Sequence, residues 1–361
     1  MGCTVSARRA SNKYRSPVLM PRHKRNMSFL LMLCIISICS HFAAPRSVSA
    51  GTAGVFSGRK QSSPDTASFP REYGEVIYRY NEKSPNHIYI IGTSHRDSLT
   101  LKNGYNTVRA QVEAYKIGEW LIRNKGLELL LPEGFFSVGN KNPEKENAVK
   151  VSYAGGAENK AQTDTGILEK RLGDNTVYVN AEMLLKENYL IKLRQVEDRK
   201  LYDAVGHDIF GLEKCGNDTS GCFFLRSELE YLQERRTAAM LQAIPDKVDY
   251  EFLQGNIQRR DALFTIGMSH LYEIIKYLRE NKITIYSPLF NTAGKEDYIA
   301  ELNLLKKNYG ITIILPKALA DDDDVLKRTR LNKIIEESRK QSTLVSSAAL
   351  PHSGEAVLVK H

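Results

Sequence analysis

Two segments of the chain end an apolar run with the same pattern, a glycine, two further residues and a histidine. The first is "HIYIIGTSH", which contains Gly92 and His95, and the second is "ALFTIGMSH", which contains Gly267 and His270. Ligands of open α/β sheets bind at the carboxyl ends of the strands. We therefore expect both imidazoles to emerge at one edge of a sheet, where neutral imidazole is a common metal ligand.

Each G-x-x-H pattern alone has a simpler interpretation, in which the histidine packs or caps a helix. Glycine permits a tight turn and a close approach of the backbone to a bound group. His270 precedes an amphipathic stretch, so we expect it in a first helical turn, whose positive end disfavours imidazolium. The repetition of the pattern in the same context favours a metal site.

Three glutamates follow other apolar runs. Glu133 follows "LELLLP", Glu182 follows "TVYVNA" and Glu213 follows "DIFGL". A buried carboxylate is costly without a positive partner, and two histidines with one carboxylate can hold a divalent ion while a further carboxylate acts as general base. Glu182 has the alternative role of starting a helix, and Glu213 that of pairing with Lys214, so Glu133 is the strongest candidate.

The elements that position these residues alternate along the chain. Short apolar runs predict strands over 75–80, 87–91, 127–131, 176–179, 208–212, 262–266, 283–286 and 311–315. Helical periodicity predicts helices over 105–124, 181–202, 226–244 and 271–278. The first two strands flank the polar turn "NEKSPN" and indicate a β-hairpin. The order predicts an α/β fold, a mostly parallel sheet with helices on both faces that starts with a β-hairpin.

Composition divides the rest of the chain. Residues 71–316 form the predicted α/β domain, preceded by a Gly/Ser/Pro-rich linker over 51–70. The polar insert 134–170 is expected to be a long loop that covers a cleft. Residues 317–361 are expected to hold a helix and a flexible tail. The acidic run 321–324 favours the N-terminus of that helix, with metal binding as an alternative.

The first 50 residues resemble an export signal. They contain eight Lys and Arg and no Asp or Glu, then the apolar run "MSFLLMLCIISICS" and a small-residue end at Ala50. We expect cleavage near Gly51 and a periplasmic or extracellular protein. An uncleaved segment over 28–40 would instead anchor the protein to a membrane, and translation has an alternative start at Met27.

Charge and cysteine usage agree with export. The whole chain has a net charge of +9, but without the first 50 residues 43 Lys and Arg face 42 Asp and Glu. This near-neutral balance argues against a nucleic-acid partner. Cys215 and Cys222 flank a polar turn and are predicted to form a disulfide in an oxidising compartment, with two separate thiols as the alternative.

Together these motifs resemble the TraB/GumN/PrgY group, which is related to the Tiki membrane metalloproteases. The resemblance rests on the two G-x-x-H motifs, on Glu133 and on "ERRTAAML", in which Arg235 matches the arginine upstream of the second motif. It covers roughly residues 75–290, with "ERR" in place of the more usual E-R-N and a long insert over 134–170. It implies an α/β fold and divalent-metal peptidase chemistry, although other branches resemble binding or inhibitory proteins.

The leading hypothesis is an exported hydrolase that depends on Mn, Zn or Fe and cleaves a peptide or amide bond. His95 and His270 would be ligands, Glu133 a ligand or general base, and Arg235 a clamp for a carboxylate or an oxyanion. Arg235 has the alternative role of pairing with Glu133 or Glu213. A protein that sequesters a peptide or haem in the same site is the competing hypothesis.

Overall fold

We analysed a computed structural model of the chain, which describes residues 69–94, 105–136, 164–176, 179–215, 219–288 and 294–348. The predicted leader, nearly all of the linker, residues 137–163 of the insert and the end of the predicted tail lie outside these residues. Within them, no helix combines the length and the apolar character that a membrane crossing requires. His95 also lies outside the described residues.

The centre of the fold is a mixed six-stranded sheet in the order β1-β8-β2-β5-β3-β4, which confirms the predicted α/β class. Its strands are β1 (Gly74–Tyr80), β2 (Asn86–Thr93), β3 (Leu129–Pro132), β4 (Lys192–Leu193), β5 (Asp261–Gly267) and β8 (Tyr309–Pro316). All neighbouring strands are parallel except β1 and β8. β1 and β2 run antiparallel across a short turn as predicted, and β8 is inserted between them.

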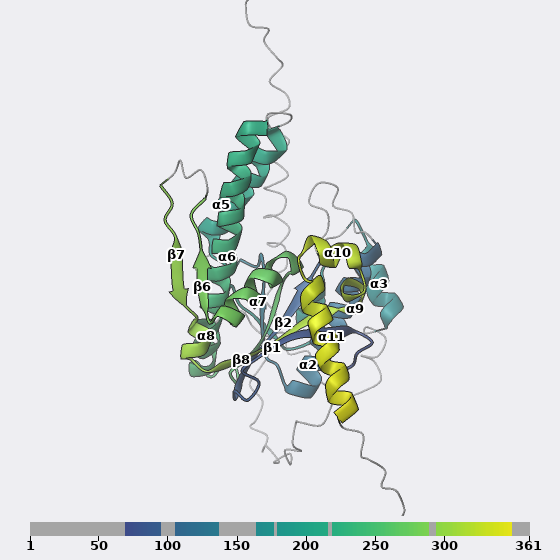
Figure 1. Ribbon diagram of the computed structural model, residues 1–361. Helices are drawn as coiled ribbons and strands as arrows, with labels where there is room; N and C mark the ends of the chain where they lie inside the picture. Colours follow the sequence, from purple (N-terminus) through teal and green to yellow (C-terminus); the bar gives the residue numbers. More distant parts are fainter. Residues whose placement is uncertain are drawn as a thin grey trace, which may run out of the picture. The chain divides into compact units, whose positions relative to one another are not determined.

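Helices cover both faces of this sheet (Figure 1). Their bounds are α2 (Tyr105–Lys125), α3 (Thr165–Gly173), α4 (Ala181–Asn188), α5 (Arg199–Lys214), α6 (Thr219–Leu253), α7 (Leu271–Glu280), α8 (Asn303–Lys306), α9 (Lys317–Ala320), α10 (Asp323–Arg328) and α11 (Asn332–Ala348). Apolar residues of α2, α3 and α4 pack on one face, and those of α6 and α7 pack on the other.

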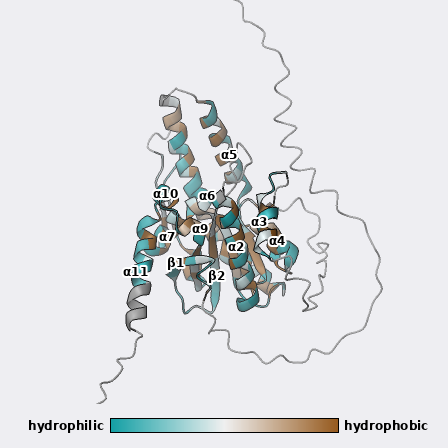
Figure 2. Ribbon diagram, turned by 90° about the vertical axis from the view of Figure 1, so that its right-hand side faces the viewer, coloured by the Kyte–Doolittle hydropathy of each residue, from teal (hydrophilic) through white to brown (hydrophobic). Residues whose placement is uncertain are grey.

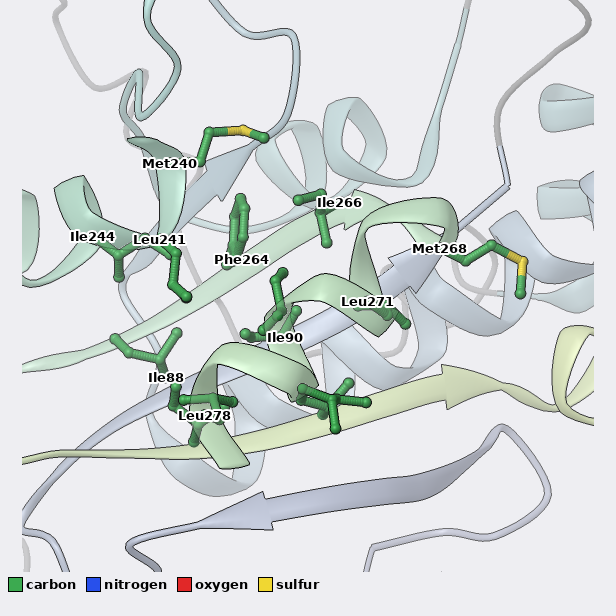
Figure 3. Packing of buried hydrophobic residues seen from close by; sticks show 14 of the residues in the cluster. Ile88, Ile90, Met240, Leu241, Ile244, Phe264, Ile266, Met268, Leu271 and Leu278 are labelled. Carbon is green, nitrogen blue, oxygen red and sulfur yellow. The ribbon is translucent and has the colours of Figure 1, made fainter. Parts of the chain in front are cut away.

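The pleat of the strands divides the core into these two layers, because successive side chains of a strand point to opposite faces. Ile88 and Ile90 of β2 pack with α6 and α7, together with Phe264 of β5 (Figure 3). Ile91 packs instead with α2, α3 and α4. Hydropathy follows the same division, with apolar residues on the central strands and polar residues on the outer sides of the helices (Figure 2).

The segment 181–202 differs from its prediction, because it is not one helix. The helix α4 ends where Tyr189 turns to extended backbone, and the chain then adds the edge strand β4 beside β3. The Tyr189 hydroxyl is held by Glu119 and Arg123 of α2, which fixes the break. A new helix, α5, begins after the capping residue Asp198.

Three other predicted elements also differ. The predicted strand 208–212 lies inside α5, because a short apolar run within a capped helix has no strand neighbour. Part of the predicted loop forms α3, which is capped by Asp164. The predicted strand 283–286 forms β6 (Lys282–Ile285), which pairs with β7 (Tyr298–Glu301) in a separate two-stranded sheet. The predicted strand 176–179 falls partly outside the described residues, and its described ends belong to no strand.

The acidic run behaves as predicted. Asp322 caps α10 by accepting a hydrogen bond from the Val325 N–H at 3.1 Å, and Asp323 and Asp324 occupy its first turn. Carboxylates at this position interact favourably with the helix dipole. The run therefore has a structural role at a helix start.

Candidate active site

Three neighbouring strand ends form one edge of the sheet. β5 lies between β2 and β3, and the three strands are parallel. Thr93 at the end of β2 is opposite Gly267 of β5, and Pro132 at the end of β3 is opposite Thr265. The segments that continue into His95, Glu133 and His270 therefore start beside one another.

Glu133 follows β3 directly, and both oxygens of its carboxylate accept hydrogen bonds. Oε2 accepts from the Gly267 N–H at 2.6 Å, and Oε1 accepts from Nη2 of Arg236 at 2.6 Å. The Glu133 N–H donates to the carbonyl oxygen of Thr265 at 2.9 Å. Its side chain is only 10% exposed, so these partners supply what a buried carboxylate requires.

Arg236, in the middle of α6, joins Glu133 to a second carboxylate. Its Nε donates to Glu197, whose side chain is fully buried and whose Oε2 accepts from the Gly134 N–H at 2.7 Å. Burial acts to lower the pKa of Arg236, but the hydrogen bond to Glu197 and the charges of Glu133 and Glu197 raise it overall. The guanidinium is a permanent cation between two acids.

His270 ends the 3-10 turn Met268–His270 that precedes α7, and its two ring nitrogens face different partners. Nδ1 lies 2.6 Å from Oγ1 of Thr237, whose own proton goes to the carbonyl oxygen of Gln233 at 2.9 Å. Nδ1 is therefore the donor to Thr237. Nε2 lies 3.4 Å from Oε1 of Glu133, and in a neutral ring this nitrogen carries a lone pair.

Glu133, Glu197, Arg236 and His270 form what we call the polar cluster. Two carboxylates face one guanidinium, and each of the four side chains is at most 10% exposed. Nε2 of His270 and Oε1 of Glu133 face each other, so these two atoms could hold a cation between them.

A chain of hydrogen bonds holds the end of β2, next in sequence to the predicted ligand His95. The carbonyl oxygen of Ser94 accepts from Nε2 of Gln111 in α2 at 2.8 Å. Oε1 of Gln111 in turn accepts from the Ala181 N–H at the start of α4 at 2.8 Å. Two helices thus fix the last described residue before His95.

The two glycines of the motifs have structural roles that differ from the predicted close approach to a ligand. A Cβ at Gly92 would lie 2.5 Å from Cδ1 of Leu271 and 3.1 Å from Cδ1 of Leu315. Glycine at this position lets α7 pack closely on β2. Gly267 has a φ of −56°, which any residue adopts, and its N–H serves as a donor to Glu133.

The structure places Arg235, the arginine predicted for the site, away from Glu133 and His270. Its guanidinium lies 3.7 Å over the ring of Tyr298 in β7, outside the polar cluster. Consecutive residues of a helix point about 100° apart, so Arg236 faces Glu133 instead. The predicted alternative of an arginine paired with Glu133 therefore describes Arg236.

The other two predicted glutamates lie outside the polar cluster. Glu182 occupies the first turn of α4, where the alternative role of starting a helix applies. It is buried with Oε2 lacking a hydrogen-bond partner, and no contact joins it to the cluster within the described part of the chain. Glu213 is exposed near the end of α5, because the segment "DIFGL" is helical rather than a strand that leads to the site.

Cys215 and Cys222 flank the connection between α5 and α6. Cys215 caps the end of α5, and Cys222 lies in the first turns of α6. The two sulfurs are not bonded to each other in the structure. A disulfide between them stays a prediction for the exported protein.

Sequence reasoning missed Glu197, Arg236 and Thr237. The buried residues Met240, Leu241 and Ile244 mark the inner face of α6, and positions 236 and 237 precede this face by one helical turn. Counting back by four would have indicated Arg236 and Thr237. Glu197 was missed because residues 181–202 were predicted to be one helix, whereas Glu197 lies in the connection between β4 and α5.

Within the described residues, no three His, Cys, Asp or Glu side chains gather in a way that could hold a metal ion. His270 and Glu133 supply two candidate ligand atoms, and a third must come from elsewhere. Comparisons with protein-family models, with curated proteins and with solved structures found no match to this chain.

Proposed function

We propose that the polar cluster, together with His95, is a metal-dependent hydrolytic site for peptide or amide bonds, of the kind implied by the resemblance to the TraB/GumN group. The observation that carries the proposal is the arrangement of His270. Its Nδ1 donates to Thr237 while its Nε2 faces Oε1 of Glu133 at 3.4 Å. Metal-ligating histidines use one ring nitrogen for the metal and donate the other N–H to a supporting partner.

The residues present fit a divalent ion such as Mn, Zn or Fe. Nε2 of His270 and a carboxylate oxygen of Glu133 would hold it, with His95 as the third ligand, and imidazole and carboxylate ligands suit these metals. A bound ion would supply a more acidic water and would polarise a carbonyl group.

The chain's own residues have separate tasks in this proposal. Oε1 of Glu133 lies 3.4 Å from Nε2 of His270, so we assign Glu133 to ligand binding, with the role of general base as the alternative. Arg236 uses two of its five N–H groups for Glu133 and Glu197. The remaining N–H groups can donate to a substrate carbonyl oxygen or to the oxyanion that develops on it.

The proposed location is outside the cytoplasm, either in the periplasm or in the extracellular space. The basic and apolar leader over 1–50 supports export, and the near-neutral charge of the remaining chain supports a peptide rather than a nucleic-acid substrate. If the leader is retained, residues 28–40 would anchor the enzyme to the membrane.

The test is hydrolysis of a mixed peptide pool by the protein purified in its exported form. The protein is supplied in turn with Mn, Zn or Fe(II), and cleavage is followed by mass spectrometry. We expect metal-dependent cleavage that disappears in His270→Ala. The matched control is His207→Ala, because this histidine lies exposed on α5. Cleavage that persists in His270→Ala, or that withstands chelation, would contradict the proposal.

A further inference from the structure

Four side chains, beginning with Arg236 of the polar cluster, form a stack in which two aromatic rings lie between two guanidinium groups. The guanidinium of Arg236 lies 5.2 Å from the ring centroid of Tyr202. The Tyr202 ring meets the Phe136 ring edge to face at 4.9 Å, and Arg199 lies 4.6 Å over the Phe136 ring. This arginine–aromatic stack leads from the cluster to the surface.

The stack comes from the segments that build the site itself. Phe136 follows Glu133 by three residues, and Arg199 and Tyr202 lie in the first turn of α5, just after Glu197. The position of its inner end is fixed, because Arg236 is bound to both glutamates. The two rings therefore lie between the buried Arg236 and the exposed Arg199.

The rings remain accessible in spite of these contacts. Tyr202 is 39% exposed and Phe136 is partly exposed. Within the described residues the Tyr202 hydroxyl makes no hydrogen bond, whereas the hydroxyls of Tyr115, Tyr189 and Tyr309 each have a partner. A ring with an unused hydroxyl beside a reactive site is available to a ligand.

The cations beside the rings are already paired with carboxylates. Arg236 is paired with two carboxylates, and Arg199 is paired with Asp203 at 3.2 Å. Because each arginine is paired, neither adds a strong attraction for an anionic or a cationic ligand group beside the rings. Apolar and aromatic groups remain, because aromatic pairs gain from edge-to-face contact and from burial.

We propose that Phe136 and Tyr202 form the subsite that recognises an aromatic or branched apolar side chain of the peptide, next to the bond that is cleaved. This inference rests on the proposed function and names its substrate class. Tyr202 and Phe136 act in recognition, whereas the polar cluster acts in hydrolysis.

The experiment measures binding and cleavage separately with the full exported form. The probes are two hexapeptides that differ at one position, Phe or Asp, within an otherwise Gly/Ser sequence. Affinities come from calorimetry and cleavage rates from mass spectrometry. We expect the Phe peptide to bind more tightly, and Phe136→Ala or Tyr202→Ala to weaken it about 3- to 10-fold, the range of aromatic contacts. The Asp peptide should be unaffected.

Two variants control for folding and for the hydroxyl group. Tyr202→Phe keeps the ring and should retain the preference for the Phe peptide. Tyr250→Ala removes an exposed tyrosine near the C-terminal end of α6 and should leave this preference unchanged. Equal binding of the two peptides by the wild type, or an unchanged preference in folded Phe136→Ala and Tyr202→Ala, would overturn the inference. Ring-dependent binding without cleavage would support the subsite and contradict the hydrolase proposal.

Discussion

Removing Glu197 should destabilise the protein more than removing any surface ion-pair partner. Glu197 has a fully buried side chain, binds Nε of Arg236 and accepts from the Gly134 N–H. Breaking a buried ion pair by removing one partner costs about 3–5 kcal/mol. Arg236 keeps Glu133, so we expect Glu197→Ala to lower the free energy of unfolding by about 3–5 kcal/mol in total.

The assay is urea unfolding followed by circular dichroism, with a matched surface control. Glu187 forms an ion pair with Arg171 at 2.7 Å, but their side chains are 54% and 35% exposed. Exposed pairs contribute about 0–1 kcal/mol, so Glu187→Ala should change the unfolding free energy by less than about 1 kcal/mol. Glu197→Gln should fall between the two, because the amide retains one acceptor. A loss below about 1 kcal/mol in Glu197→Ala would refute the structural role of this carboxylate.

Three further predictions concern other parts of the chain. Burial, assisted by the charge of Arg79, lowers the pKa of His87 from 6.5 to about 4. The unfolded chain therefore binds a proton at His87 before the folded chain does, and the free energy of unfolding falls by about 3 kcal/mol as the pH drops from 6.5 to 4. Unfolding of the wild type and of His87→Leu, measured as a function of pH, would show the difference. Gly92→Ala should lower the free energy of unfolding by about 1–3 kcal/mol, because the added Cβ would collide with Leu271. Gly206→Ala, which has open space around it in α5, should raise the free energy of unfolding by up to about 1 kcal/mol in the same experiment. Equal effects of the two substitutions would contradict the packing argument. Cys215 and Cys222 should be joined in the exported protein, and alkylation of both without reductant, seen by mass spectrometry, would exclude the disulfide.

The sequence predicted the central strands well, because their apolar runs are long enough to be distinctive. β2, β5 and β8 carry β-branched residues over seven or eight positions, and each was predicted to within two residues. The short elements were not predictable in this way. β4 has two residues, and it exists because its backbone pairs with β3 rather than because of its own composition.

The sequence predicted the location of the candidate site, at the strand ends, but only some of its residues. Glu133 and His270 lie at the ends of strands that the sequence marks clearly, so their proximity followed from topology. Arg236 and Glu197 depend on the rotation of α6 and on the edge strand β4, which tertiary packing decides. The insertion of β8 between β1 and β2 likewise requires contacts between distant parts of the chain.

The most direct test of the central claim is the metal content of the purified, full-length exported protein, measured by elemental mass spectrometry. We expect one divalent ion per chain in the wild type and in His207→Ala. We expect less than a tenth of that content in His95→Ala and His270→Ala, because loss of a ligand exceeds the 10–100-fold effect on affinity of changes in supporting residues. Stoichiometric metal in both histidine variants, or a Soret band without a divalent ion in the wild type, would contradict the account.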